Sequence, residues 1–309
     1  MGDEDLPAWV RSGDRLLVIA NPVTRRNIRA IIDTLRGAVP EGVTIDVRIT
    51  RRAGEARDLA RRHAPGSRMV VAVGGDGTVA DVASEVVAMG IPLAILPGGS
   101  TNIIARELGI PTDIHSGTAL IRGPHAHKRI DVGRADRRHF VHMAGVGFDS
   151  RLFARANSRL KRKIGWLAYL PGAARSLLDR PSFVTVTVDD SEVSARSPLV
   201  LVANGRAVAH PKLAIATGIS SSDGMFDVFI VTATGLIPLA RVLGRLAMRQ
   251  LDHSPYVTRL RGKRVTIDAE PSLPVEFDGD VDGSTPVELE IIPGALDVVV
   301  PLLNARKGR

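Results

Sequence analysis

Met69-Val70-Val71-Ala72-Val73-Gly74-Gly75-Asp76-Gly77-Thr78 is the most informative stretch of this 309-residue sequence. An apolar run of strand length ends in a glycine-rich turn, and apolar residues at helical spacing follow from Val79 to Val87. Glycine lets a ligand approach the backbone, and a helix N-terminus offers unpaired N–H groups, so this order forms a place for phosphate. Asp76 would repel phosphate, which indicates that it holds a divalent cation or forms a proton path. The turn therefore indicates phosphoryl transfer, the alternative being a tight turn without a ligand.

The sequence on both sides of this turn alternates strands and helices over the first 135 residues. Strand-like runs cover residues 15–21, 43–50, 69–73 and 93–96, and helical spacing marks residues 28–35, 56–63 and 79–89. Strands separated by helices predict a parallel sheet that is covered on both faces. We expect a doubly wound α/β domain that binds ligands at the carboxyl ends of its strands.

The periodicity changes after about Gly133. Alternation in steps of two appears at residues 183–188, 199–203, 226–231, 265–267 and 287–291, and only residues 151–178 and 236–250 look helical. This pattern predicts a second, mostly antiparallel β domain, with a sandwich as the expected form. The predicted domains are residues 1–133 and 134–309, with a last strand that could return to the first domain. The active site is expected between the two domains.

Composition limits the class of protein and its partners. The net charge is +8 and the pI is about 10.5, which favours anionic partners such as nucleotide or anionic lipid. Aromatic residues make up only 4%, so nucleic acid is not an expected partner. There is no cysteine, no apolar run of membrane-spanning length and no secretory signal. We expect a cytoplasmic protein, peripheral on the inner face of the membrane, whose oligomeric state stays open, with a homodimer among the options.

A second glycine turn, Pro97-Gly98-Gly99-Ser100-Thr101-Asn102, follows the next strand and leads into another helix-like segment. The hydroxyl groups of Ser100 and Thr101 can donate to phosphate oxygens, although capping of the next helix is an alternative. Asn21 ends the first strand in register with both turns and could cap a helix or bond a phosphate. Two turns at the tips of neighbouring strands predict one crevice for a polyphosphate.

An acidic run, Val275-Glu276-Phe277-Asp278-Gly279-Asp280-Val281-Asp282-Gly283, lies far downstream. Phosphorylation of an alcohol needs a carboxylate to accept the proton of the hydroxyl and a metal to neutralise the phosphates. Asp278 and Asp280 could supply either. A solvated Asp-Gly hairpin is the alternative, and physical reasoning on the sequence alone favours it.

Residues 151–178 combine arginine and lysine with apolar and aromatic residues and contain no acidic residue until Asp179. Such a stretch suits an anionic membrane surface, and a solvated helix covering the β domain is an equal alternative. Histidine metal sites are disfavoured, because the sequence has neither cysteine nor a zinc-binding histidine motif.

These elements, in this order, resemble the diacylglycerol kinase catalytic family, which includes bacterial lipid kinases and sphingosine and ceramide kinases. The resemblance spans nearly the whole chain. It rests on Asn21-Pro22, Thr50, Gly74 to Thr78, Pro97 to Asn102, Asp131-Val132-Gly133, Gly145 to Asp149, Asn204-Gly205, Asp223-Gly224 and Asp278-Gly279-Asp280.

The resemblance implies a lipid kinase that uses ATP and Mg²⁺ in a cleft between an α/β domain and a β-rich domain. It assigns to the nucleotide Asn21, Thr50, Gly74, Gly75, Asp76, Gly77, Thr78, Gly99, Ser100 and Thr101. It assigns to catalysis Asp278, Asp280 and Asp76, and to the metal Asp76, Asp131, Asp223 and Asp280. The acceptor implied first is diacylglycerol, at an anionic membrane surface, which would yield phosphatidic acid.

The sequence departs from the family pattern at several positions. Ile103 replaces an aspartate in the second glycine motif, so one member of the acidic network around the metal is missing. Asp280 stands where the family commonly has glutamate. Ser220-Ser221-Ser222 precedes Asp223 where some bacterial members have further metal ligands, which argues against a separate structural Mg²⁺ site.

Several alternative functions therefore stay open from the sequence. The acceptor could instead be a sphingoid base or another lipid. A small-molecule kinase similar to NAD kinase shares the first glycine turn. A catalytically inactive module that binds lipid or nucleotide is the alternative that Ile103 suggests.

Overall fold

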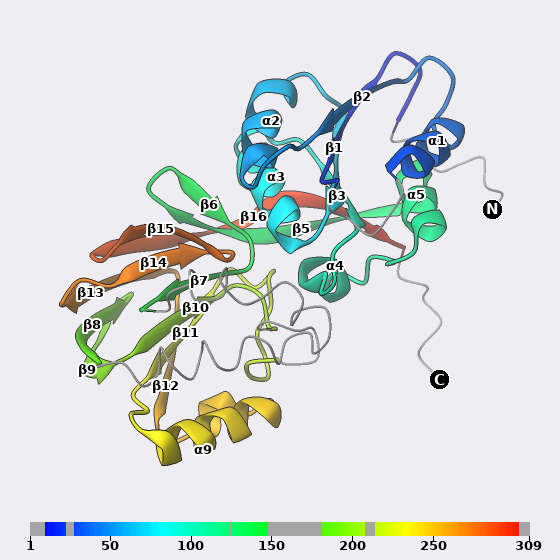
Figure 1. Cartoon of the computed structure of the whole chain (residues 1–309). Helices are drawn as coiled ribbons and strands as arrows, with labels where there is room; N and C mark the ends of the chain where they lie inside the picture. Colours follow the sequence, from blue (N-terminus) through cyan, green and yellow to red (C-terminus); the bar gives the residue numbers. More distant parts are fainter. Residues whose placement is uncertain (1–9, 23–27, 124, 148–180, 208–213, 303–309) are drawn as a thin grey trace. The chain divides into compact units, whose positions relative to one another are not determined.

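The computed structural model describes residues 10–22, 28–123, 125–147, 181–207 and 214–302. Two compact units make up the chain (Figure 1): Met1–Ile130 together with Ala295–Arg309, and Asp131–Gly294. Two strands carry the chain from one unit into the other, β5 (His125–Ala135) and β16 (Val287–Pro301). The basic segment 151–178, predicted to be helical, lies outside the described residues.

The first unit is built on a parallel sheet. Its strands are β1 (Arg15–Ala20), β2 (Thr44–Ile49), β3 (Met69–Gly74) and β4 (Leu93–Pro97). They lie in the order β2-β1-β3-β4, and the far end of β16 adds to β4 in parallel, with Val298 opposite Leu93. Its helices are α1 (Ile28–Ala38), α2 (Glu55–His63), α3 (Asp76–Met89), α4 (Ile103–Glu107) and α5 (Ile114–Arg122).

Helices cover both faces of this sheet. Figure 1 shows α2 and α3 together on one face and α1 and α5 together on the other. Every residue of β3 is buried, as is Leu16–Ala20 of β1, which explains why these strands read as continuous apolar runs. The predicted doubly wound α/β domain is confirmed.

Two helices differ from the sequence-based expectation. Helix α3 begins at Asp76 and not at Val79, because its first turn is polar and shows no apolar period. Helix α5 was not predicted at all. Its N-cap is Asp113, whose side chain accepts a 2.8 Å hydrogen bond from the N–H of Ser116. An aspartate followed by apolar residues at helical spacing is the sequence signal that could have indicated this helix.

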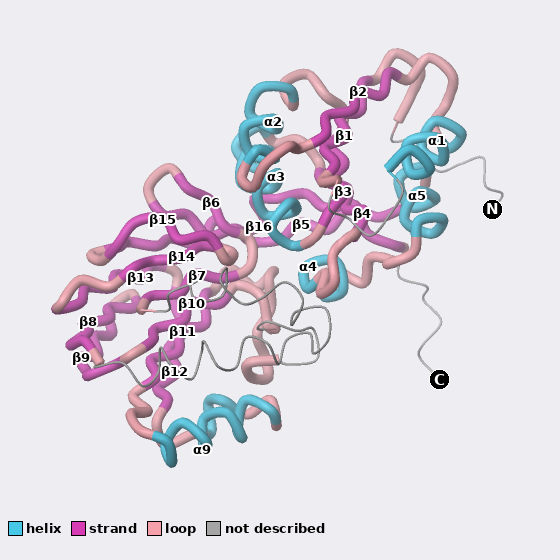
Figure 2. The backbone as a smooth tube through the Cα atoms, in the orientation of Figure 1, coloured by secondary structure: helices cyan, strands magenta, loops and turns pink. Residues whose placement is uncertain are grey.

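Strands make up most of the regular structure in the described part of the second unit (Figure 2). Its further strands are β6 (Arg138–Phe140), β7 (Met143–Val146), β8 (Ser182–Val188), β9 (Ser191–Ser197), β10 (Leu199–Ala203), β11 (Phe226–Val231), β12 (Val257–Gly262), β13 (Arg264–Glu270), β14 (Pro274–Phe277) and β15 (Asp280–Ser284). Helix α9 (Leu236–Ala247) and the short 3₁₀ helix η2 (Leu251–His253) complete it.

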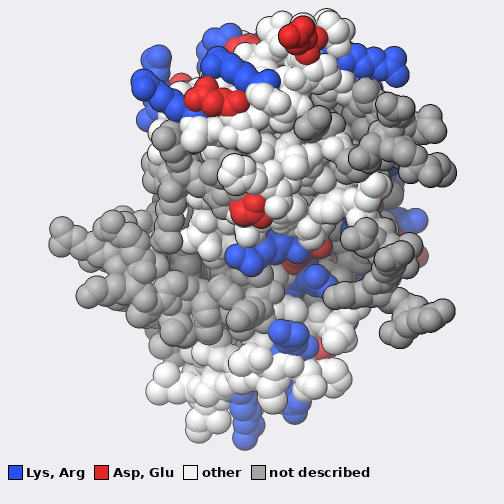
Figure 3. Space-filling view, turned by 90° about the vertical axis from the view of Figure 1, so that its right-hand side faces the viewer, with Lys and Arg blue, Asp and Glu red and all other residues white. Residues whose placement is uncertain are grey.

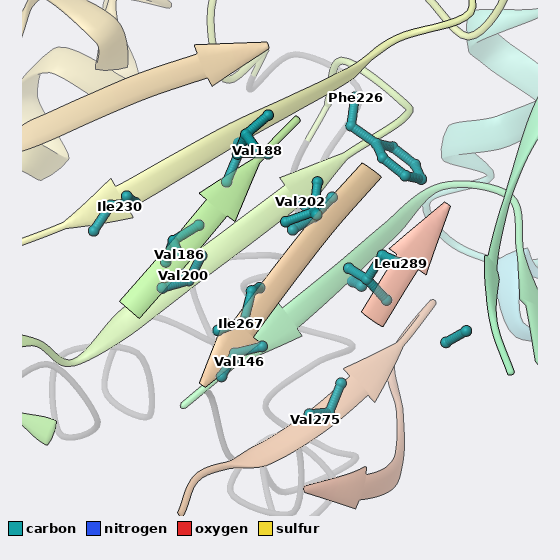
Figure 4. Packing of buried hydrophobic residues seen from close by; sticks show 14 of the residues in the cluster. Val146, Val186, Val188, Val200, Val202, Phe226, Ile230, Ile267, Val275 and Leu289 are labelled. Atoms are coloured by element: carbon teal, nitrogen blue, oxygen red, sulfur yellow. The ribbon is translucent and has the colours of Figure 1, made fainter. Parts of the chain in front are cut away.

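These strands form two layers. One antiparallel sheet has the order β12-β11-β10-β7-β14-β15, and the other layer runs β16-β13-β8-β9. Apolar side chains of both layers meet in one core (Figure 4), for example Val186 and Ile267 from one layer and Val200 and Val146 from the other. The ring of Phe140 stacks on that of Phe226 with centroids 5.7 Å apart. The predicted antiparallel, sandwich-like domain is confirmed.

Candidate functional site

The predicted phosphate-binding segments of the first unit all follow carboxyl ends of its parallel strands. Asn21 follows β1 and Thr50 follows β2, and each is tied to a neighbouring strand, Asn21 by its N–H to Val73 O and Thr50 by its N–H to Ala20 O, both at 2.9 Å. The first glycine turn follows β3 and the second follows β4. Because the sheet is parallel, its register brings these four segments to one edge.

The two glycine turns pack backbone against backbone. The N–H of Gly98 donates to the carbonyl of Gly74 at 2.7 Å. A Cβ atom added to Gly99 would lie 2.7 Å from the Cα of Gly75, and one added to Gly75 would lie 3.3 Å from the Cα of Gly99. Glycine is therefore required at 99 by the close approach of the turns and is favoured at 75.

Asp76 joins the first turn to the helix that follows the second. Its Oδ2 accepts a 2.8 Å hydrogen bond from Thr101 Oγ1, and its Oδ1 accepts a 3.1 Å bond from the N–H of Ile104 in the first turn of α4. A carboxylate at a helix N-terminus is stabilised by the unpaired N–H groups there. The structure thus gives Asp76 a positioning role that the sequence did not reveal.

The N-terminus of α3 is open to a ligand. Its N-cap, Gly75, has no side chain that could accept hydrogen bonds from the first turn. Gly77 is exposed, its backbone is helical, and a Cβ atom added there would meet no atom within 4 Å. Thr78 is buried, and its Oγ1 accepts a 3.3 Å hydrogen bond from Asn21 Nδ2. The protein itself does not require glycine at 77, whereas a phosphate group lying on this turn would.

The second turn is held from within by a residue that received no separate role in the sequence analysis. Asn102 adopts a left-handed backbone, and its side chain accepts from the N–H of Gly99 at 2.9 Å and donates to the carbonyl of Gly99 at 3.0 Å. Arg106 Nε donates to the carbonyl of Thr101 at 3.1 Å. Ser100 is exposed at the tip, where its hydroxyl can reach a ligand.

In the second unit, Asp278 is fixed by backbone groups. Its carboxylate accepts hydrogen bonds from the N–H groups of Val141, His142 and Met143 at 2.8–3.0 Å. Its backbone is left-handed, with φ at 51°, a conformation that aspartate tolerates better than most residues. Desolvation raises the pKa of Asp278 above its ordinary value of 3.8, while these three N–H groups and His142 act in the opposite direction.

Asp280 differs from Asp278 in every respect. It begins β15, and its side chain is 63% exposed. Arg138 lies beside it at 3.5 Å and pairs more closely with Asp282 at 2.7 Å, while its guanidinium also covers the ring of Phe277. Arg138 was not singled out from the sequence, because 142 residues separate it from Asp280. Of the two predicted catalytic carboxylates, Asp280 is the more accessible.

Asp131 is buried, and each of its oxygens accepts a hydrogen bond from the backbone. Oδ2 accepts from the N–H of Gly224 at 2.7 Å and Oδ1 accepts from the N–H of Gly294 at 2.8 Å. Its carbonyl accepts from Asn204 Nδ2, which also donates to Val141 O. The structure therefore uses Asp131 and Asn204 to hold segments of the second unit together.

Asp223 is paired with an arginine. Arg261 lies 2.6 Å from Asp223 and 3.1 Å from the buried Asp227, and Arg259 lies 2.7 Å from Asp227. Burial raises the pKa of Asp227, and both arginines oppose that shift. Guanidinium groups thus neutralise Asp223, which is one of the predicted metal ligands, and the nearby Asp227.

The predicted metal ligands do not form a ready-made metal centre. Among the residues that the structure describes, no group of three or more histidine, aspartate or glutamate side chains could hold a metal ion. Asp131 and Asp223 are engaged as described above, and Asp76 binds Thr101 and α4. An Mg²⁺ ion that arrives with a nucleotide needs only one or two carboxylates from the protein. Phosphate oxygens and water molecules supply its other ligands.

Comparison with known proteins agrees with this two-unit organisation. Residues 15–135 match the family model of the diacylglycerol kinase catalytic domain, and residues 142–300 match that of the YegS C-terminal NAD kinase beta sandwich-like domain. A diacylglycerol kinase of Bacillus subtilis is 27% identical over 301 residues, which cover 95% of this chain and 98% of the relative. The uncharacterized protein sll0036 of Synechocystis is 26% identical over 310 residues, covering 93% and 70%.

A solved structure shows the same fold. The crystal structure of a diacylglycerol kinase from Bacillus anthracis aligns with a TM-score of 0.71 at 20% sequence identity, covering 95% of this chain and 98% of that one. The chain therefore shares its fold with that protein.

Proposed function

The chain belongs to the lipid kinase family in which a diacylglycerol kinase catalytic domain precedes the YegS C-terminal domain, and from this membership we propose that it transfers the γ-phosphoryl group of ATP to the hydroxyl group of diacylglycerol. The product would be phosphatidic acid. The choice of diacylglycerol follows the name of the matching domain and of the Bacillus subtilis relative.

The observation that carries the proposal is the open pair of glycine turns at the strand tips. Gly77 leaves space at the N-terminus of α3, where the helix dipole and unpaired N–H groups favour phosphate. Gly75 and Gly99 let the second turn lie directly against the first. Two backbone surfaces of this kind suit a polyphosphate better than a single phosphate group.

Roles for the polar residues follow from their positions. The hydroxyl group of Ser100 would donate to phosphate oxygens, and Asn21, Thr50 and Thr78 would line the nucleotide side of the site. Asp76 keeps the second turn and α4 in place through Thr101 and Ile104. Mg²⁺, bound mainly by phosphate oxygens, would supply the positive charge that offsets the phosphates.

The acidic turn of the second unit would supply the proton acceptor for the lipid hydroxyl. Asp278 is immobilised by three backbone N–H groups, and Asp280 is exposed two residues away. A carboxylate in this role contributes roughly 10²–10⁴ to the rate. Loss of this carboxylate should therefore abolish most of the activity without abolishing nucleotide binding.

The test is a phosphoryl-transfer assay with labelled ATP and three separate acceptors: diacylglycerol, sphingosine and NAD. We expect label in phosphatidic acid, and a loss of roughly 10²–10⁴ in rate for Asp280→Asn or Asp278→Asn. Asp282→Asn is the matched control, since its carboxylate also pairs with Arg138 and is 56% exposed.

Each other outcome identifies a rival. Wild-type rates in both Asp278→Asn and Asp280→Asn contradict the role given to the acidic turn. If label is transferred only to NAD or only to sphingosine, that compound is the phosphoryl acceptor in place of diacylglycerol. Tight ATP binding without transfer to any acceptor, including a total lipid extract, favours the inactive binding module that Ile103 suggests.

A further inference from the structure

Helix α9 has a buried apolar face and an exposed side that mixes apolar residues with arginine. One face packs on the second unit, where Leu239 and Val242 are buried and Leu243 and Leu246 are partly buried against the same core. These four residues follow one another at helical spacing. The inner face of α9 is thus fully explained by the fold.

The outer face carries exposed apolar side chains beside its arginines and has no acidic residue. At 100° per residue, Ile237, Arg241, Gly244 and Met248 lie opposite the buried face. Ile237 is 69% exposed and Met248 is 57% exposed, and Leu236 at the helix start is 72% exposed. Among the described residues only six large hydrophobic side chains are exposed, and these three share one short helix and its end. Such a concentration indicates a binding surface.

The charge of this surface has a single sign. Arg241, Arg245 and Arg249 follow along the helix and its end, and no acidic residue occurs between residues 233 and 251. The next acidic residue, Asp252, is paired with Arg259 at 2.9 Å. Figure 3 shows arginine or lysine side chains projecting from uncharged surface at the lowest edge of the view, where Figure 1 places α9, and no acidic side chain beside them.

We propose that the exposed side of α9 and the two residues after it, with Leu236, Ile237, Arg241, Arg245, Met248 and Arg249, dock on the surface of an anionic lipid bilayer. Apolar side chains would enter the interface and arginine stems would reach the headgroups, as in other amphipathic helices that lie on membranes. The proposal rests on the proposed function, because a kinase for diacylglycerol must reach a substrate that lies within a bilayer. None of the described helices is long and apolar enough to cross a bilayer.

A second copy of the chain suits this face less well. A two-fold symmetric contact would place the same surface of both subunits together and bring their three arginines face to face. No acidic residue of the helix could compensate. Anionic headgroups instead offer the opposite charge, and each arginine near such a surface strengthens binding by roughly fivefold.

The test is co-sedimentation of the full chain with vesicles, in the absence of ATP. We expect binding to vesicles of phosphatidylcholine and phosphatidylglycerol and much weaker binding to phosphatidylcholine alone. Ile237→Gln combined with Met248→Gln should weaken binding at least about tenfold, since each side chain loses its apolar partner. Arg245→Gln combined with Arg249→Gln should weaken binding only to the anionic vesicles.

Matched controls come from the same unit. Phe183→Gln removes another exposed apolar side chain, on β8 and 51% exposed, and Arg196→Gln removes an exposed arginine on β9. Both should bind vesicles as the wild type does, and circular dichroism should show that every variant is folded. Equal binding of the wild type and the α9 variants, or equal losses in the controls, would overturn the proposal. Sedimentation velocity that shows a dimer in the wild type and a monomer in the α9 variants would assign this face to a second copy.

An activity measurement separates this proposal from the proposed function. The α9 variants should phosphorylate short-chain dioctanoylglycerol in detergent micelles at the wild-type rate and lose activity only on vesicles. If no acceptor is phosphorylated but the α9 variants lose vesicle binding, docking stands and the kinase assignment fails. If transfer occurs but vesicle binding is unchanged in the variants, the kinase assignment stands and docking on α9 fails.

Discussion

Thr101 Oγ1 donates a 2.8 Å hydrogen bond to Asp76 Oδ2, and this bond ties the second glycine turn to the first helical residue after the first turn. The same carboxylate caps α4 through the N–H of Ile104. Asp76, which the sequence analysis predicted to lie beside phosphates, thereby sets the spacing of the two turns.

Thr101→Val should lower the free energy of unfolding by about 1–3 kcal/mol, because it removes a donor to a charged group. Asp76→Asn should cost a similar amount, and the double variant should cost less than the sum of the two, since both changes break one bond. Urea unfolding of the four proteins measures this coupling. Additive losses would mean that the bond contributes nothing to stability.

Gly77→Ala should have opposite effects on folding and on binding. Alanine in a helix is more stable than glycine by about 0.5–1 kcal/mol, and the added Cβ meets no protein atom within 4 Å. ATP binding should nevertheless fall at least about tenfold, because the Cβ would occupy the space of a phosphate. Calorimetric titration with ATP and thermal unfolding give the two values.

Gly37→Ala is the control for this substitution. Gly37 lies in α1 and is equally open, so alanine there should stabilise the protein and leave ATP binding unchanged. Unchanged ATP affinity in Gly77→Ala would contradict the proposal that a phosphate group binds at the N-terminus of α3.

Asp278→Asn should change the pH dependence of stability. Burial raises the pKa of Asp278 in the folded protein above 3.8, so the folded state binds the proton more tightly than the unfolded state. The contribution of this group is therefore complete below its unfolded pKa and is lost as the pH rises through its folded pKa. Between these two pKa values, the free energy of unfolding of the wild type should fall relative to that of Asp278→Asn as the pH rises. Outside this range the difference between the two proteins should stay constant.

Urea unfolding at a series of pH values from 3 upward tests this behaviour. Asp282→Asn, which changes an exposed carboxylate, should follow the wild type. A wild-type curve that gains stability against Asp278→Asn with rising pH would show that the three backbone N–H groups outweigh burial.

Arg259→Met should lower the free energy of unfolding by about 1.5–3 kcal/mol, because it removes one of the two cationic partners of the buried Asp227 and leaves only Arg261. The loss should shrink at low pH, where protonation removes the charge of Asp227. Arg264→Met, whose side chain is 80% exposed, is the control and should change stability little. Removal of divalent cations with EDTA should leave the melting temperature of the wild type unchanged, because arginines already neutralise Asp223 and Asp227.

The sequence allowed strands to be predicted wherever their burial follows a regular pattern over six or seven residues. Strand β3 is buried throughout and reads as an unbroken apolar run, and β8 alternates buried and partly exposed residues as a sandwich strand should. The short strands β6 and β7 were not predicted, because three or four residues are too few to show a period.

The candidate site was predictable in its location and less so in its contacts. Glycine turns at strand tips follow from local pattern, and so their edge of the sheet could be foreseen. The capping of α4 by Asp76 joins residues 28 apart, and Arg261 meets Asp223 across 38 residues. Such pairings depend on the packed fold, and no short-range periodicity encodes them.

The course of β16 has a consequence for biosynthesis. Val298 pairs with Leu93 of β4, and Leu296, Val298 and Val299 are buried in the first unit, although they are translated almost two hundred residues after β4. A nascent chain that has not yet reached residue 295 presents the edge of β4 without its neighbour, and open strand edges invite aggregation. The first unit is thus translated first and completed last, so a chain that is released before residue 295 would expose the edge of β4.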